Sequence, residues 1–470
     1  MITFRRLLTF LRPYRGQNIL SIVLASLAMG FTVLIPWLVG AVIDAIQDGE
    51  RSHLVPLALT IVAAGLLRLG LTAARRIIAG KVSLAVEFDL RSRIYEHLQS
   101  LELGFFDAQQ TGQLMSRATV DLQSIRFFLG YGLIFITQSA LTLVLAGGVM
   151  IYLQPGLALL ALLPVPIVVV TAMRFNRYSR PALQEVQQRI AELTVEAEES
   201  VSGVRVVKAF ARERHMLERF RRAVSRVFEQ NVTSTRIRAF YTPLIAFLPN
   251  LGLAVVLLVG GNQVINGSMS LGDFSAFYIY LVMLIGPMRM LGTALGMSQR
   301  AIASGNRLFE VLDRQPEIAS APDAVPLPAG KGHVLLDGVS LDYGGTEEAL
   351  SDIDLEVEAG KVVALVGPTA SGKTSLVALL ARLYDPSKGS VRIDGVDLRD
   401  VRLSSLRSQI AFVADDSFLF SATVAENISY AKPDATREEV ELAARRAQAA
   451  GFIEALPEGY ETMVGERGLT

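Results

Sequence analysis

The chain has 470 residues, 45 basic and 45 acidic side chains, no cysteine, and a hydrophobic content of 51%. The absence of cysteine excludes disulfides and thiolate metal sites, and the zero net charge gives no indication of a nucleic-acid partner. Charged residues make up only 19% of the chain. Soluble domains carry about a quarter, so the apolar excess indicates a membrane protein.

Six apolar runs reach or approach the roughly 20 residues that a helix needs to cross a bilayer. They lie at 18–43, 54–74, 130–153, 156–173, 241–265 and 275–297. The first run follows a basic start but lacks a small-residue cleavage site, which predicts a retained span rather than a signal peptide. Arg68 lies inside the second run, where a charge is costly. Two roles for Arg68 stay open: a place on the substrate path, or pairing and snorkelling within the bundle.

The distribution of basic residues predicts how the chain is oriented. Three short connections, at 44–53, 153–156 and 260–274, contain one basic residue between them. The long connections at 75–127 and 174–238 contain seven and fourteen. Lys and Arg remain on the cytoplasmic side, so the sequence predicts a multi-pass protein of the cell membrane with both termini in the cytoplasm.

The two long connections are expected to be helical. They contain few Gly or Pro residues, and their apolar residues recur at helical spacing. Each is therefore predicted to form two helices that descend from the membrane by about 35 Å and are joined at the bottom. Four prolines between 313 and 332 then end the helical pattern. The predicted domains are a membrane domain over 1–312, a linker over 313–332 and a soluble domain over 333–470.

The soluble part has an α/β pattern. Alternating residues predict strands near 333–343 and 350–360, and the apolar run 361–367 predicts a fully buried strand. Further strands are predicted at 389–395 and 410–415. Helices are expected from Lys373 to Pro386, over 403–408 and after Asp434.

A phosphate-binding pattern, G-x-x-x-x-G-K-[ST], stands between the predicted buried strand and the helix that follows it. Its residues are Gly367, Pro368, Thr369, Ala370, Ser371, Gly372, Lys373 and Thr374. The glycines let the backbone amides and the helix N-terminus face phosphate oxygens. Lys373 is expected to neutralise the β- and γ-phosphates, and the Thr374 hydroxyl to ligate Mg²⁺. The sequence therefore predicts ATP and Mg²⁺ binding, with Ser375 included in the ATP site.

Together these features resemble the ABC exporters, whose half-transporters join six membrane spans to one nucleotide-binding domain. The stretches 105–126 and 198–213 resemble the cytoplasmic loops of that family, which implies coupling helices near 107–114 and 206–215. The resemblance implies a six-span α-helical membrane domain and an α/β nucleotide-binding domain. Tyr343, 24 residues before Gly367, resembles the aromatic residue that stacks on adenine.

Other parts of the soluble half both match and depart from the family pattern. The stretches 417–428 and 464–468 resemble family elements, but Asp415 stands where the family usually has glutamine. Aspartate can still ligate Mg²⁺, yet it is shorter and adds a negative charge. The substitution favours an asymmetric site and hence a heterodimer with a second half-transporter, with a homodimer as the alternative.

The family's signature motif and catalytic glutamate do not occur before Thr470. We therefore expect a nucleotide-binding domain that is incomplete at its C-terminal end, no catalytic residue in this chain, and no efficient hydrolysis by it alone. The function implied is ATP-driven export of an amphipathic, drug-like or lipid-like cargo across the cytoplasmic membrane by one half of a dimeric transporter, with membrane lipid as a further partner. The alternatives are an ATP-gated regulatory or channel protein and a catalytically inactive partner subunit.

Overall fold

The computed structural model describes residues 2–344, 348–414 and 418–465, and their side chains except those of 288–292 and 295. Its contacts divide the chain into two compact units. The first comprises Met1–Leu101 and Phe105–Pro316, and the second comprises Glu102–Gly104 and Glu317–Thr470. We describe each unit by itself.

The first unit is built almost entirely from helices. Its α-helices are α1 (Ile2–Thr9), α2 (Arg15–Gln47), α3 (Arg51–Ser100), α4 (Leu103–Asp107), α5 (Thr111–Ser116), α6 (Leu122–Phe127), α7 (Leu133–Leu153), α8 (Pro155–Leu162), α9 (Pro164–Ser202), α10 (Val204–Ala209), α11 (Glu213–Val255), α12 (Gly261–Ile265) and α13 (Leu271–Leu312). A 3-10 turn, η1 (Arg12–Tyr14), precedes α2. Three π-helical segments interrupt the longer helices: η2 (Arg117–Asp121), η3 (Phe128–Gly132) and η4 (Val256–Gly260).

Among the described residues of this unit, five helical segments are long and apolar enough to cross a membrane. They are Arg12–Gln47, Arg51–Ser100, Thr111–Leu153, Pro155–Ser202 and Glu213–Ile265. Each contains one of the first five predicted spans, so the protein has a multi-pass helical membrane domain. In α13 the apolar stretch found among the described residues, Leu271–Pro287, is shorter than a full span. The sixth span therefore stays a prediction.

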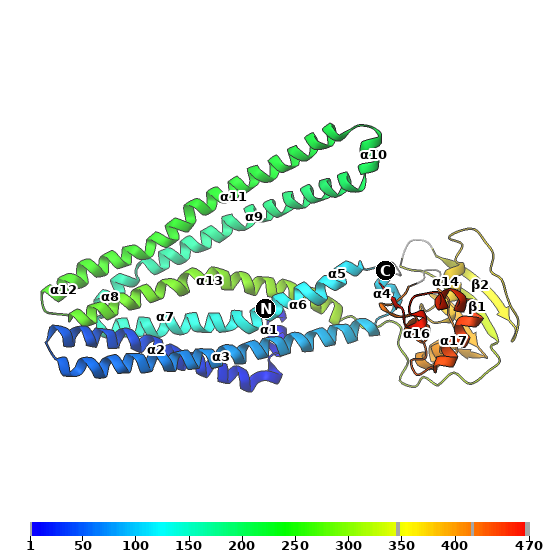
Figure 1. Cartoon of the computed structure of the whole chain (residues 1–470), viewed down its shortest axis with the longest axis horizontal. Helices are drawn as coiled ribbons and strands as arrows, with labels where there is room; N and C mark the ends of the chain where they lie inside the picture. The colour runs from blue at the N-terminus through cyan, green and yellow to red at the C-terminus, as the bar shows by residue number, and fades with distance from the viewer. Residues whose placement is uncertain (1, 345–347, 415–417, 466–470) are drawn as a thin grey trace. The chain divides into compact units, whose positions relative to one another are not determined.

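The membrane helices form a bundle and a separate pair. Helices α2, α3, α7 and α13 lie side by side, whereas α9 and α11 pack mainly against each other and end at α10 (Figure 1). This pairing agrees with the prediction that the connection at 174–238 is two joined helices. The helix α10 buries none of its residues, and its Val204 and Val206 side chains are exposed.

The second unit contains a small antiparallel sheet with the order β2-β1-β3-β4. Its strands are β1 (Val334–Leu341), β2 (Leu350–Val357), β3 (Lys388–Ile393) and β4 (Val396–Asp397). Its helices are α14 (Lys373–Leu380), η5 (Leu398–Asp400), α15 (Leu403–Ser408), α16 (Val424–Ile428), α17 (Arg437–Arg446), α18 (Ala450–Glu454) and η6 (Gly459–Glu461). Two short strands, β5 (Ala422–Thr423) and β6 (Met463–Val464), pair separately. The core gathers Leu336, Val339, Leu376, Val391 and Leu406 between the sheet and helices α14 and α15.

Two strand predictions for this unit were wrong. Residues 361–367 and 410–414 form no strand, and Val362 and Val366 are 99% and 91% exposed rather than buried. A strand exists only where a neighbour satisfies its backbone hydrogen bonds. Among the described residues β1 pairs with β2 and β3, and no strand lies beside 361–367 or 410–414. Their apolar patterns are therefore not enough to form a strand.

The proline-rich segment at 313–332 lies mostly within the second unit and contacts it along part of its length. Val325 forms a parallel bridge with Val401, and its amide donates to the Asp400 carbonyl at 3.0 Å. Leu327 is buried in the core of this unit. The boundaries of the predicted linker, 313–332, stay a prediction.

Candidate functional site

The predicted phosphate-binding loop precedes α14 and depends on backbone that glycine adopts most easily. Gly372 has φ +83°, and a Cβ there would lie 2.6 Å from Leu350 Cδ2 and 2.8 Å from the Ala349 carbonyl oxygen. Glycine at this position therefore lets the loop pack against the start of β2. Ala370 has φ +65°, a left-handed conformation that L-residues rarely adopt. The loop is thus tightly curved immediately before the N-terminus of α14.

Lys373 is the first residue of α14, and its side chain reaches back into this loop. Its Nζ donates to the carbonyl oxygens of Gly367, at 3.0 Å, and Pro368, at 2.7 Å. It also lies 3.2 Å from Ser371 Oγ. A cavity of about 270 Å³ adjoins the lysine and is lined by Ala349 and residues 370–375. The positive end of α14 and the ammonium group face the same small space, which fits a chain of phosphates.

Sheet pairing brings the predicted adenine-stacking residue near this loop. Leu341 at the end of β1 pairs with Leu350 at the start of β2, against which Gly372 packs. Tyr343 follows two residues later, is about half exposed, and meets the Tyr384 ring edge-on at 4.9 Å. An exposed aromatic face close to a phosphate loop can stack on a base. The stacking role of Tyr343 stays a prediction.

Of the other predicted site residues, four lie in or beside this loop and Arg68 lies in the membrane domain. Pro368 and Thr369 lie in the loop and are exposed, and Thr374 and Ser375 begin α14. Asp415 lies outside the described residues. The Arg68 side chain is exposed and does not line the membrane-domain cavity that its own helix helps to form. The role of Arg68 on a substrate path stays a prediction.

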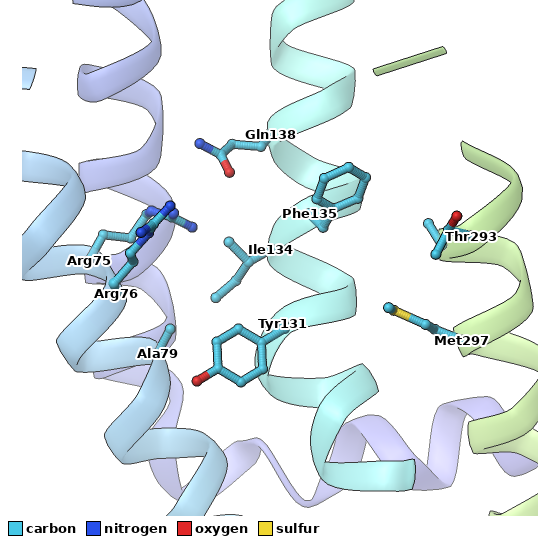
Figure 2. A pocket seen from close by; sticks show the side chains of 10 residues that line it. Arg75, Arg76, Ala79, Tyr131, Ile134, Phe135, Gln138, Thr293 and Met297 are labelled. Atoms are coloured by element: carbon cyan, nitrogen blue, oxygen red, sulfur yellow. The ribbon is translucent and has the colours of Figure 1, made fainter. Parts of the chain in front are cut away.

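That cavity lies within the first unit and has a volume of about 410 Å³. Figure 2 shows side chains from α3, η3, α7 and α13 around it. The lining residues are Arg75, Arg76, Ala79, Tyr131, Ile134, Phe135, Gln138, Thr293, Ala294 and Met297. Its size is in the range of pockets that hold small organic ligands, about 300–1,000 Å³.

Our sequence interpretation did not single out Arg75 and Arg76. The sequence places both residues in a basic cytoplasmic connection, because they follow directly after the apolar run that ends at residue 74. The signal available in the sequence is two adjacent arginines directly after an apolar run. Only the tertiary packing shows that Arg75 is buried.

Comparisons with known proteins agree with both parts of the chain. The family model for the ABC transporter transmembrane region matches residues 18–288, and the ABC transporter model matches residues 350–465. The chain is 35% identical over its whole length to an uncharacterized ABC transporter ATP-binding protein of Bacillus subtilis, covering 80% of that protein.

Two further relatives carry more specific names. An ATP-dependent lipid A-core flippase of Syntrophus aciditrophicus is 34% identical over 100% of this chain and 78% of its own length. A putative multidrug export ATP-binding/permease protein of Staphylococcus aureus is 34% identical over 99% of this chain and 82% of its own length. With two matching domain models and relatives aligned along nearly the whole sequence, the chain belongs to the ABC transporter family.

Proposed function

We propose that this chain is one half of a dimeric exporter that uses ATP to move amphipathic molecules across the cell membrane. One observation carries the proposal: the same chain combines a bundle of membrane-spanning helices around a cavity with a loop shaped for phosphates. The names of the relatives, a multidrug exporter and a lipid flippase, support an amphipathic cargo. The basic connections support cytoplasmic placement of both termini.

The residues of the loop have distinct roles in this proposal. Backbone amides of residues 370–374 and the Lys373 ammonium would hold the phosphates, and Tyr343 would stack on the adenine. The Thr374 hydroxyl, in the first turn of α14, would ligate Mg²⁺. When bound, Mg²⁺ neutralises phosphate charge. We assign no catalytic base to this chain.

We further propose that the partner is a second half-transporter, a heterodimer being favoured over a homodimer because of Asp415. The exposed apolar side chains at the end of the α9–α11 pair, Val206 and Phe210, support a partner surface there.

We propose coupling segments at 107–114 and 206–215. We also propose the domain boundaries 1–312, 313–332 and 333–470, with a sixth membrane span over 275–297.

The test uses the full-length protein in liposomes. We expect ATP hydrolysis that an amphipathic cargo stimulates, nucleotide trapping by vanadate, and cargo movement that depends on ATP. The Lys373→Ala variant should lose all three and keep its membrane insertion. Ion currents that ATP binding opens without hydrolysis would indicate a gated channel instead. If the protein binds ATP but hydrolyses it only when a paralogue is co-expressed, it is an inactive partner subunit.

A further inference from the structure

The cavity in the membrane domain has a cationic side and an apolar side. Arg75 and Arg76 of α3 lie on one side, and Ile134, Phe135 and Met297 lie on the other (Figure 2). No acidic side chain is among the described residues that line it. A ligand that fits this lining has an anionic group and an apolar body.

Arg75 is the most unusual of these residues. It is 6% exposed, and its Nε has no hydrogen-bond partner among the described residues. The structure shows no ion pair for Arg75 or Arg76 within the part of the chain that it describes. A guanidinium that is removed from water without an anion is costly. Charged residues in membrane helices typically face the bundle interior or a cavity, pair with a counter-charge, and mark substrate pathways.

The apolar side of the cavity is held in place by close packing. Tyr131 belongs to η3, a π-helical segment of the kind that often marks functional sites. A Cβ at the neighbouring Gly130 would lie 2.5 Å from Ser83 Cβ, so η3 contacts α3 closely at this point. This contact fixes Tyr131 beside the helix that carries the two arginines.

The distance of the two arginines from the start of α3 is long enough to place them in a lipid headgroup region. Arg75 is 24 residues after Arg51, where the helix begins. At 1.5 Å per residue the separation is about 36 Å, slightly more than the ~30 Å hydrocarbon core of a bilayer. With the orientation proposed above, Arg75 and Arg76 lie near the cytoplasmic headgroups.

We infer that this cavity binds the anionic headgroup of an amphipathic cargo, with Arg75 and Arg76 as the recognition residues. The chemistry is that of a phosphate-bearing amphiphile: the guanidinium groups hold the phosphate oxygens, and the apolar part lies against Tyr131, Phe135 and Met297. The inference rests on the proposed export function and specifies its cargo. An adjoining cavity of about 400 Å³, which shares Met297 and adds Arg300, provides room for a larger molecule.

The test is binding selectivity of the full-length protein in nanodiscs of zwitterionic lipid. Two fluorescent lipids with identical chains serve as probes, one ending in a phosphate monoester and the other in phosphocholine. We expect the lipid with the phosphate monoester to bind at least about tenfold more tightly than the phosphocholine lipid. Hydrogen bonds to a charged group contribute a free energy of this size. Inorganic phosphate alone should not displace the phosphate monoester lipid. Equal affinities for the two lipids would overturn the inference. Binding of inorganic phosphate as tightly as the phosphate monoester lipid would also overturn it, because the arginines would then bind a free anion.

Variants on the same helix supply the control. Arg75→Gln should abolish the selectivity, whereas Arg51→Gln, which removes an exposed arginine at the start of the same helix, should preserve it. Arg75→Lys keeps the positive charge at this position. Unfolding temperatures of the three variants show whether lost selectivity comes from the lost charge or from a destabilised fold. Selectivity that persists in Arg75→Gln would contradict the assignment. ATP-dependent movement of both lipids at equal rates would refute this inference and leave the export function standing. Selective binding of the phosphate monoester without ATP-dependent movement of either lipid would refute the export function and leave this inference standing.

Discussion

Arg6 of α1 forms a two-fold hydrogen-bonded ion pair with Asp313, the residue that follows the last turn of α13. Each of the two N–O distances is 2.6 Å, and the Arg6 guanidinium lies 3.8 Å from the centre of the Phe309 ring. These contacts join the start of the membrane domain to its end, across 307 residues of sequence. They hold α1 against α13 at the point where the chain leaves the membrane domain.

We predict that Arg6→Gln loosens α1 without unfolding the bundle. Both partners are partly exposed, so the ion pair itself contributes about 1 kcal/mol or less. Hydrogen exchange of the α1 amides should accelerate severalfold, while exchange in α2 and α3 should not change. Arg5→Gln is the matched control because Arg5 is exposed on the same helix. Equal acceleration in both variants would contradict the role of the ion pair.

The same contact should respond to acid. The hydrogen bond from Arg6, together with the charges of Arg6 and His97, lowers the pKa of Asp313 below its ordinary value of 3.8. A lowered folded pKa means that the stabilisation is complete above the ordinary value and is lost as pH falls through the lowered one. Protection of α1 should therefore hold down to about pH 4 and decline below it. In Asp313→Asn this decline should be absent.

A pair of substitutions in the phosphate loop should have opposite effects. Gly372→Ala introduces a Cβ that meets Leu350 and the Ala349 carbonyl at φ +83°, so ATP affinity should fall about tenfold or more. Ala370→Gly instead relieves a left-handed alanine at φ +65° and should leave ATP binding unchanged or slightly improved. Titration with a fluorescent ATP analogue measures both. Similar losses in the two variants would show that the loop backbone does not set the affinity.

A buried carboxylate between η2 and α13 offers a test of stability. Asp121 is 5% exposed and accepts hydrogen bonds from Arg307 Nε at 2.9 Å and Ser304 Oγ at 2.8 Å. Arg307→Ala should destabilise the membrane domain by about 1–3 kcal/mol, because the carboxylate loses its charged partner. The double variant Asp121→Ala and Arg307→Ala should be less destabilised than the sum of the two single variants. Thermal unfolding in detergent measures this cycle, and strict additivity would contradict the coupling.

Tyr343 provides a direct test of base stacking. Tyr343→Leu should weaken ATP binding severalfold, in line with about 1 kcal/mol for an aromatic contact, and Tyr343→Phe should not. Affinity for inorganic triphosphate should be the same in both variants, because it has no base to stack. A parallel loss of triphosphate affinity in Tyr343→Leu would indicate a structural role beside Tyr384.

The sequence predicted those features that depend on residues close together in the chain. The tight turn at the start of α14 is one, since Gly372 and Lys373 are adjacent in the sequence, and the phosphate-binding role of this loop stays a prediction. The membrane helices are another, because a continuous apolar run has few alternatives to a helix in lipid. The spans at 18–43 and 54–74 correspond to parts of α2 and α3.

The features that the sequence did not predict depend on distant neighbours. The apolar runs 361–367 and 410–414 have the composition of buried strands, but a strand also needs a paired neighbour. The arginines show the same limit. Arg68 is conspicuous in sequence and exposed in the fold, whereas Arg75 follows an apolar run and is buried by helices that lie far away in the sequence.

The hydrogen bonds of Lys373 have a consequence for how ATP affinity should be interpreted. Its ammonium group is held by the carbonyls of Gly367 and Pro368, so the loop supplies its own oxygen ligands where phosphate oxygens would bind. A nucleotide must compete with those carbonyls for the same positive charge. The measured affinity is then an exchange constant between two sets of oxygens, and weak binding need not mean a poorly formed loop.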